Sequence, residues 1–167
     1  MALIDAVLAE FNHELENTQK LFERVPEDKL AWKPHERSMT LARLSGHIAE
    51  IPAWGRAILG QEAYDLEQPG DVKPAEPVNR HELLQLLQRN ASILREAAEG
   101  TKDDALLANW SLKKGDRLIV MMPRIAALRS FVMNHVVHHR GQLTVFLRLL
   151  DVPLQAIYGG TADEPGF

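Results

Sequence analysis

The chain has no cysteine among its 167 residues. This absence excludes a disulfide framework, a cysteine-ligated zinc ribbon, an iron–sulfur cluster and a thiol nucleophile. Any site for a transition metal must therefore be built from histidine and carboxylate side chains.

The chain also lacks an excess of positive charge and a long apolar segment. Its formal net charge is -4, which disfavours nucleic acid as a partner. No stretch approaches 18 uncharged apolar residues, so we expect no transmembrane helix and no membrane partner. Asp5 and Glu10 interrupt the apolar positions of the N-terminal segment, which argues against a signal peptide. We therefore expect a cytoplasmic protein.

Several motifs of common enzyme classes are missing as well. The sequence has no G-x-S-x-G, no P-loop and no Rossmann glycine fingerprint, which argues against a serine hydrolase and a nucleotide-dependent enzyme. H-E-x-x-H is also absent, which weakens the hypothesis of a metalloprotease.

Amphipathic helical segments make up most of the chain. Its length fits one domain, which we expect to span residues 1–167. Two short alternating runs around a glycine turn, in residues 109–120, predict a β-hairpin. Together these features predict an all-α four-helix bundle with a small hairpin between the third and fourth helices. Apolar spacing, caps and breakers place the four helices at residues 3–24, from Thr40 to about Gly60, from a cap at Asn79 to about Glu99, and from Pro123 to about Leu150.

Prolines predict two local features of this pattern. Pro52 lies inside the second helix and should kink it, because it lacks the backbone donor. Pro26 should open a short helical turn after the first helix. Residues 67–79 are rich in proline, glycine and acids and predict a long loop that could cover a site.

Histidines cluster in the last predicted helix, at positions 135, 138 and 139. On a helical wheel, His139 lies near the centre of the apolar stripe, His135 within about 40° of it, and His138 on the flank. Two inward imidazoles one turn apart can share one metal ion. A polar core cluster or a dimer contact is the alternative interpretation.

His47 in the second helix is the best candidate for a third ligand. It shares a ridge with Leu44 and Ile51 and can therefore face inward, although it could instead be a boundary histidine at an interface. Three neutral imidazoles leave coordination positions open, which suits a catalytic ion. Zinc or nickel would fit, with iron or manganese as alternatives. Of the other histidines, we expect His13 and His81 to face solvent, while His35 lies in a loop and cannot be placed.

Other polar and aromatic residues near these positions have two interpretations each. We expect Arg140 to form a surface or dimer ion pair rather than bind a substrate carboxylate. Glu50 should lie on an exposed helix side rather than act as a base. Gln142 could hold a ligand histidine in its neutral form, or it could simply cap the polar end of the core. Trp32 and Trp54 should belong to the core or to a pocket wall.

Two segments of the chain resemble signatures of the DinB-like superfamily. These are LAWKPHERSMTLARLSGHIAEIPAW and NHVVHHRGQLTVFLRLLDVPLQAIYGGTADE, and the similarity extends over most of the chain. The resemblance implies an up-down-down-up four-helix bundle that is often dimeric. It also implies a metal held by His47, His135 and His139, with His138 outside the ligand set. Asp151 stands where relatives often have a helix-ending glycine.

The resemblance also implies a range of activities. Some relatives are similar to S-transferases or isomerases that use a low-molecular-weight thiol, and others to metal-dependent hydrolases. We therefore expect a metal-dependent enzyme that forms a homodimer and acts on a small-molecule substrate, with thiol transfer and hydrolysis both open. The alternative is a non-catalytic dimeric bundle that binds a metal or a small ligand.

Overall fold

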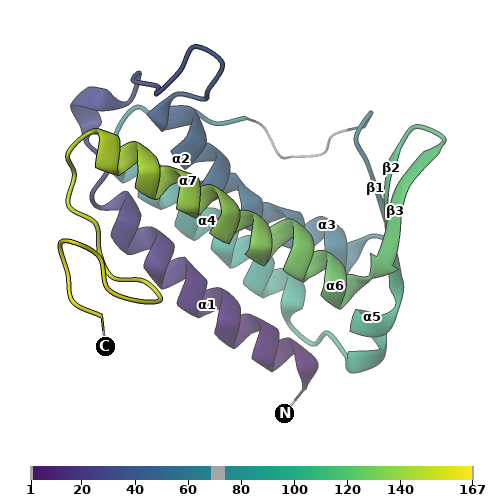
Figure 1. Cartoon of the computed structure of the whole chain (residues 1–167). Helices are drawn as coiled ribbons and strands as arrows, with labels where there is room; N and C mark the ends of the chain where they lie inside the picture. Colours follow the sequence, from purple (N-terminus) through teal and green to yellow (C-terminus); the bar gives the residue numbers. More distant parts are fainter. Residues whose placement is uncertain (1, 69–73, 167) are drawn as a thin grey trace.

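The computed structural model describes residues 2–68 and 74–166, and the chain is mostly helical (Figure 1). Among these residues, no helix is long and apolar enough to cross a membrane. The longer helices are α1 (Leu3–Phe22), α2 (Leu41–Glu50), α3 (Trp54–Gly60), α4 (Arg80–Ala98) and α7 (Asn134–Leu149), and the shorter ones are α5 (Asp103–Leu107) and α6 (Arg124–Leu128).

Helix α7 packs against two neighbours, α1 and α2 (Figure 1). Helix α4 packs against α1, α2 and α3 on the other side of the core. Apolar side chains at helical spacing, such as Val7, Phe11 and Leu15 of α1, are buried in the shared core. Because α7 has two partners, side chains on two of its sides are buried.

Polar caps begin two of the predicted helices at the expected residues. The Thr40 hydroxyl accepts from the Arg43 amide at 3.1 Å, and α2 follows. The Asn79 side chain accepts from the Glu82 amide at 2.8 Å, and α4 follows. The predicted short turn after Pro26 is also present, as a 3₁₀ turn over Glu27–Lys29.

The second predicted helix is divided at Pro52, as expected. Helix α2 ends at Glu50, a 3₁₀ turn covers Ile51–Ala53, and α3 begins at Trp54. Proline has no amide hydrogen, so it cannot donate to the carbonyl four residues earlier. The nearby carbonyl of Ala49 accepts from the buried Asn90 side chain at 2.8 Å, which ties α4 to this break.

The last predicted helix contains an unexpected π-helical turn. Helix α6 leads into a π turn over Arg129–Met133, where the Asn134 amide donates to the Arg129 carbonyl, and α7 follows. Such turns are often found at functional sites, and this one ends two residues before His135. After α7, Asp151 has a φ of 57°, the left-handed conformation that glycine adopts most easily.

The predicted hairpin is present but is part of a larger sheet. Strands β2 (Asn109–Lys114) and β3 (Arg117–Pro123) are antiparallel. Strand β1 (Ala63–Asp65) pairs parallel with β2, so the sheet has three strands in the order β1-β2-β3. The expectation of a hairpin alone was wrong. Strand β1 was missed because its three residues are too few to show the alternating pattern of a strand. The predicted loop 67–79 is non-helical where it is described, and residues 69–73 lie outside the described part.

Candidate metal centre

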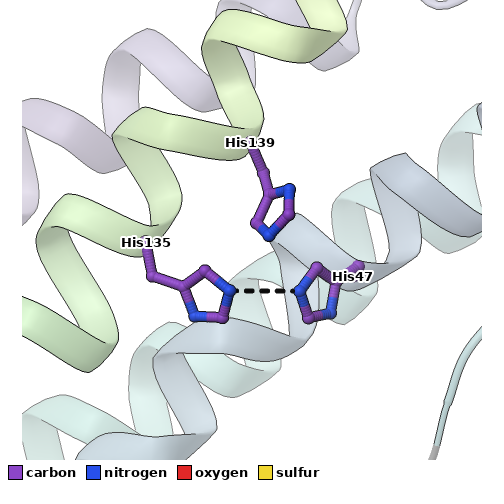
Figure 2. A group of neighbouring side chains, drawn as sticks. All are labelled: His47, His135 and His139. Carbon is purple, nitrogen blue, oxygen red and sulfur yellow. Dashed lines mark hydrogen bonds between the residues drawn. The ribbon is translucent and has the colours of Figure 1, made fainter.

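Three histidine side chains from two helices meet between α2 and α7 (Figure 2). His47 comes from α2, and His135 and His139 come from successive turns of α7. Each offers one ring nitrogen, and these three atoms lie within 4.8 Å of one another. All three side chains are half-buried. The convergence expected from the sequence is therefore present, in a group that could hold a metal ion.

The spacing of one pair of these nitrogens fits a bound transition metal. Two imidazole nitrogens that bind one zinc ion tetrahedrally, at about 2.0–2.1 Å each, lie about 3.3–3.4 Å apart. The Nε2 atoms of His47 and His135 are 3.3 Å apart. A donor set of three imidazoles suits a transition metal better than calcium or magnesium.

Hydrogen bonds at the other ring nitrogens orient two of the imidazoles, and a carboxylate lies near the third. His139 Nδ1 lies 2.7 Å from Gln142 Oε1, the contact predicted for Gln142. The ring of His135 hydrogen-bonds the backbone of Phe131, within the π turn. His47 Nδ1 lies 3.5 Å from Glu50 Oε2. A hydrogen bond at one ring nitrogen determines which nitrogen can bind a metal.

Burial keeps two of these imidazoles neutral. Burial, followed by the nearby His139 and His47, lowers the pKa of His135 to about 4. Burial also lowers the pKa of His139, while its hydrogen bond to Gln142 acts in the opposite direction. Both rings therefore carry a free lone pair at neutral pH, as a metal ligand requires.

The remaining histidines lie outside this group. His138 is exposed and its Nε2 lies 3.2 Å from the Gln142 side-chain nitrogen, so it flanks His139 without joining the group. His13 and His81 are exposed, as expected. His35, which the sequence could not place, is exposed and accepts from the Arg37 amide.

Glu50 is not on an exposed helix side, and that expectation was wrong. Its side chain is buried, at 5% exposure, and pairs with Arg43 at 3.1 Å. The amide of Ala75 also donates to Glu50. The burial arises because the segment around Ala75, remote in sequence, packs over this face of α2.

Arg140 is not a surface residue, and that expectation was also wrong. It is 2% exposed and pairs with Glu14 of α1. Arg140 lies off the apolar stripe that faces α2, but its side of the helix faces α1, the second neighbour of α7.

Two aromatic pairs connect the α2–α3 region with the α6–α7 region, one pair on either side of the three histidines. Trp54 of α3 stacks on Phe131, with ring centroids 6.3 Å apart. Trp32, before α2, meets Phe146 of α7 edge-on at 5.7 Å. All four rings are half-buried, so each pair combines packing with exposed apolar surface.

Comparisons with known proteins identify similar chains. The model of the DinB family matches residues 3–165. The uncharacterized protein YrdA of Bacillus subtilis is 24% identical over 161 residues, which cover 96% of this chain and 91% of that protein. A DinB-like protein from Bacillus cereus has a TM-score of 0.72 at 23% identity, covering 92% of this chain and 97% of its own. The DinB-like protein YjoA of Bacillus subtilis has a TM-score of 0.67 at 19% identity, covering 89% and 96%. At these identities the solved structures establish similarity of fold alone.

Proposed function

Because the chain belongs to the DinB family, we propose that it is a metal-dependent enzyme whose divalent ion is held by His47, His135 and His139. The observation that supports this most strongly is the meeting of three histidine nitrogens within 4.8 Å. Zinc or nickel suits these ligands best, and iron or manganese are the alternatives.

The number of ligands supports a catalytic role for the ion. Three protein ligands leave at least one coordination position for another molecule. In such a site a divalent ion supplies Lewis acidity toward a carbonyl, a water molecule or a thiolate. The chain itself would hold the imidazoles in place and present the aromatic surfaces of Trp54 and Phe146 to a small-molecule substrate.

Two reaction classes follow from this arrangement. In the first, a low-molecular-weight thiol takes part in S-transfer or isomerisation. Because the chain has no cysteine, the thiol would have to be a cosubstrate. In the second, water replaces the thiol and the reaction is a hydrolysis. A non-catalytic protein that binds a metal or a small ligand is the alternative to both.

The experiment that tests this proposal uses protein stripped of metal and reloaded with zinc or nickel. Thioether, ester and amide substrates are assayed with and without a panel of small thiols. Turnover that requires a thiol supports S-transfer, and turnover without one supports hydrolysis. Stoichiometric metal with no turnover supports the non-catalytic alternative, and the absence of bound metal refutes the proposal.

We also propose an up-down-down-up arrangement of the four helical regions and a homodimer. Val145 and Leu149, one turn apart on α7, are 57% and 58% exposed, and a second copy of the chain could cover them. Light scattering coupled to size-exclusion chromatography tests the assembly. A monomer at high protein concentration would refute the dimer.

A further inference from the structure

One face of α2 carries a guanidinium, a carboxylate and an imidazole in contact. Arg43 Nη2 lies 3.1 Å from Glu50 Oε2, and Arg43 Nη1 lies 3.3 Å from Glu50 Oε1. The same Oε2 atom lies 3.5 Å from His47 Nδ1. The opposite nitrogen of that ring, Nε2, faces His135. The carboxylate thus lies behind the imidazole, on the side away from the other two histidines.

The backbone of Ala75 holds this carboxylate from a second direction. Its amide donates to Glu50 Oε1, and its carbonyl accepts from Arg43 Nη1 at 3.2 Å. Gly46 permits the close approach, because a Cβ there would fall on the Ala75 carbonyl oxygen. Glu50 is consequently 5% exposed, and a carboxylate so buried needs paired, hydrogen-bonding neighbours.

In this arrangement one carboxylate oxygen of Glu50 can still accept a further hydrogen bond. Oε1 accepts from two donors, whereas Oε2 accepts from Arg43 and still has a lone pair near His47. The distance of 3.5 Å is slightly longer than a formed hydrogen bond, so a positioning role requires His47 and Glu50 to approach one another more closely. Glu50 is also outside the group of three nitrogens, which argues against its being a ligand itself.

We propose that Glu50, fixed by Arg43 and by the backbone of Ala75, is the positioning residue for His47. Its carboxylate accepts the hydrogen of Nδ1, which fixes the tautomer and leaves Nε2 as the ligand atom. The same contact makes the imidazole a stronger donor to a metal. This role rests on the proposed function, because it requires a metal at Nε2. It parallels the contacts that Gln142 makes to His139 and the Phe131 backbone makes to His135.

Glu50 also anchors the segment at Ala75, so a test must separate anchoring from positioning. Glu82 offers a matched control. Its carboxylate accepts from the Val78 amide at 2.8 Å, in the same segment, and no contact with a histidine is found for it among the described residues. Glu50→Ala and Glu82→Ala both release the segment, but only the first removes the partner of His47.

Competition with a chromophoric chelator measures the affinity for zinc of four metal-free proteins. These are the wild type, Glu50→Ala, Glu50→Gln and Glu82→Ala. Loss of such a partner weakens metal binding about 10–100-fold, and we expect this for Glu50→Ala. Glu50→Gln should lose less, because the amide oxygen can still accept the Nδ1 hydrogen. Glu82→Ala should bind like wild type. The visible spectrum of the cobalt-loaded protein should change in Glu50→Ala only.

Histidine ¹⁵N NMR of the metal-free wild type gives a readout that needs no variant. We expect His47 to carry its hydrogen on Nδ1. A hydrogen on Nε2, wild-type affinity in Glu50→Ala, or an equal loss in Glu82→Ala would overturn the positioning role. If Glu50→Ala does not fold, the tautomer and Glu50→Gln decide. A wild type that binds neither zinc nor nickel, iron or manganese would refute the proposed function itself, whereas the outcomes above refute only the role of Glu50.

Discussion

Arg140 and Glu14 form a buried ion pair between α7 and α1, with Nη2 2.5 Å from Oε2. The guanidinium also donates to the Glu14 carbonyl at 2.9 Å and contacts the Tyr158 hydroxyl at 2.6 Å. Arg140 directly follows His139 in α7. The pair therefore fixes the rotation of α7 about its axis, and this rotation turns His139 toward α2.

Replacing Arg140 should destabilise the fold strongly. Arg140→Ala leaves the buried Glu14 carboxylate without its cation, and such losses cost about 3–5 kcal/mol in the free energy of unfolding. Urea unfolding measures this. Arg148→Ala is the control, because its pair with Asp163 is much more exposed, with side chains 44% and 25% exposed, and should contribute little to stability. Similar losses in the two variants would contradict a special role for the buried pair.

Gly46→Ala and Gly141→Ala should have opposite effects on stability. Alanine is favoured over glycine inside a helix by about 0.5–1 kcal/mol. At Gly141 a Cβ meets nothing within 4 Å, so this gain should appear as a higher melting temperature. At Gly46 a Cβ would collide with the Ala75 carbonyl, so the melting temperature should fall. An increase in both variants would show that the segment at Ala75 moves aside freely.

The ion pair of Asp163 should make a small part of the stability depend on pH. Its hydrogen bond with Arg148 lowers the pKa of Asp163 from the ordinary value of 3.8, and the Leu154 amide adds to this. Because the folded pKa is the lower one, the stabilisation is complete above the ordinary pKa and is lost as pH falls through the folded pKa. Wild type should melt above Asp163→Asn at pH 7, and the difference should close below about pH 4. A difference that does not shrink as the pH falls below about 4 would contradict this assignment.

Removing the metal should leave the helices in place. The ligands lie on α2 and α7, whose apolar residues such as Leu44 and Leu143 are buried in the shared core. After chelation we expect the far-UV circular dichroism spectrum to stay nearly unchanged. The free energy of unfolding should fall only by the free energy of metal binding, which lowers the melting temperature accordingly. Collapse of the helical signal would instead indicate a structural ion.

The sequence predicted the helices and the histidine cluster because both depend on local periodicity. His135 and His139 are one turn apart on an apolar stripe, and His47 shares a ridge with buried residues of α2. The family resemblance then selected the same three residues. No longer-range information was needed to predict that these side chains face inward.

The missed features depend on contacts between remote segments. Arg140 is buried because α7 packs against α1 as well as α2, and a helical wheel assumes a single buried side. Glu50 is buried by the backbone around Ala75, and no sequence pattern links these two positions. The π turn at Arg129–Met133 and strand β1 also left no signal, since neither has a characteristic spacing of residues.

The most direct test is the metal content of untagged protein and of four single histidine variants, measured by elemental analysis after loading with zinc or nickel and removal of excess. Wild type and His138→Ala, a control on the same helix, should retain one ion per chain. His47→Ala, His135→Ala and His139→Ala should each lose most of it. No ion in wild type, or full retention in the three ligand variants, would contradict the three-histidine site.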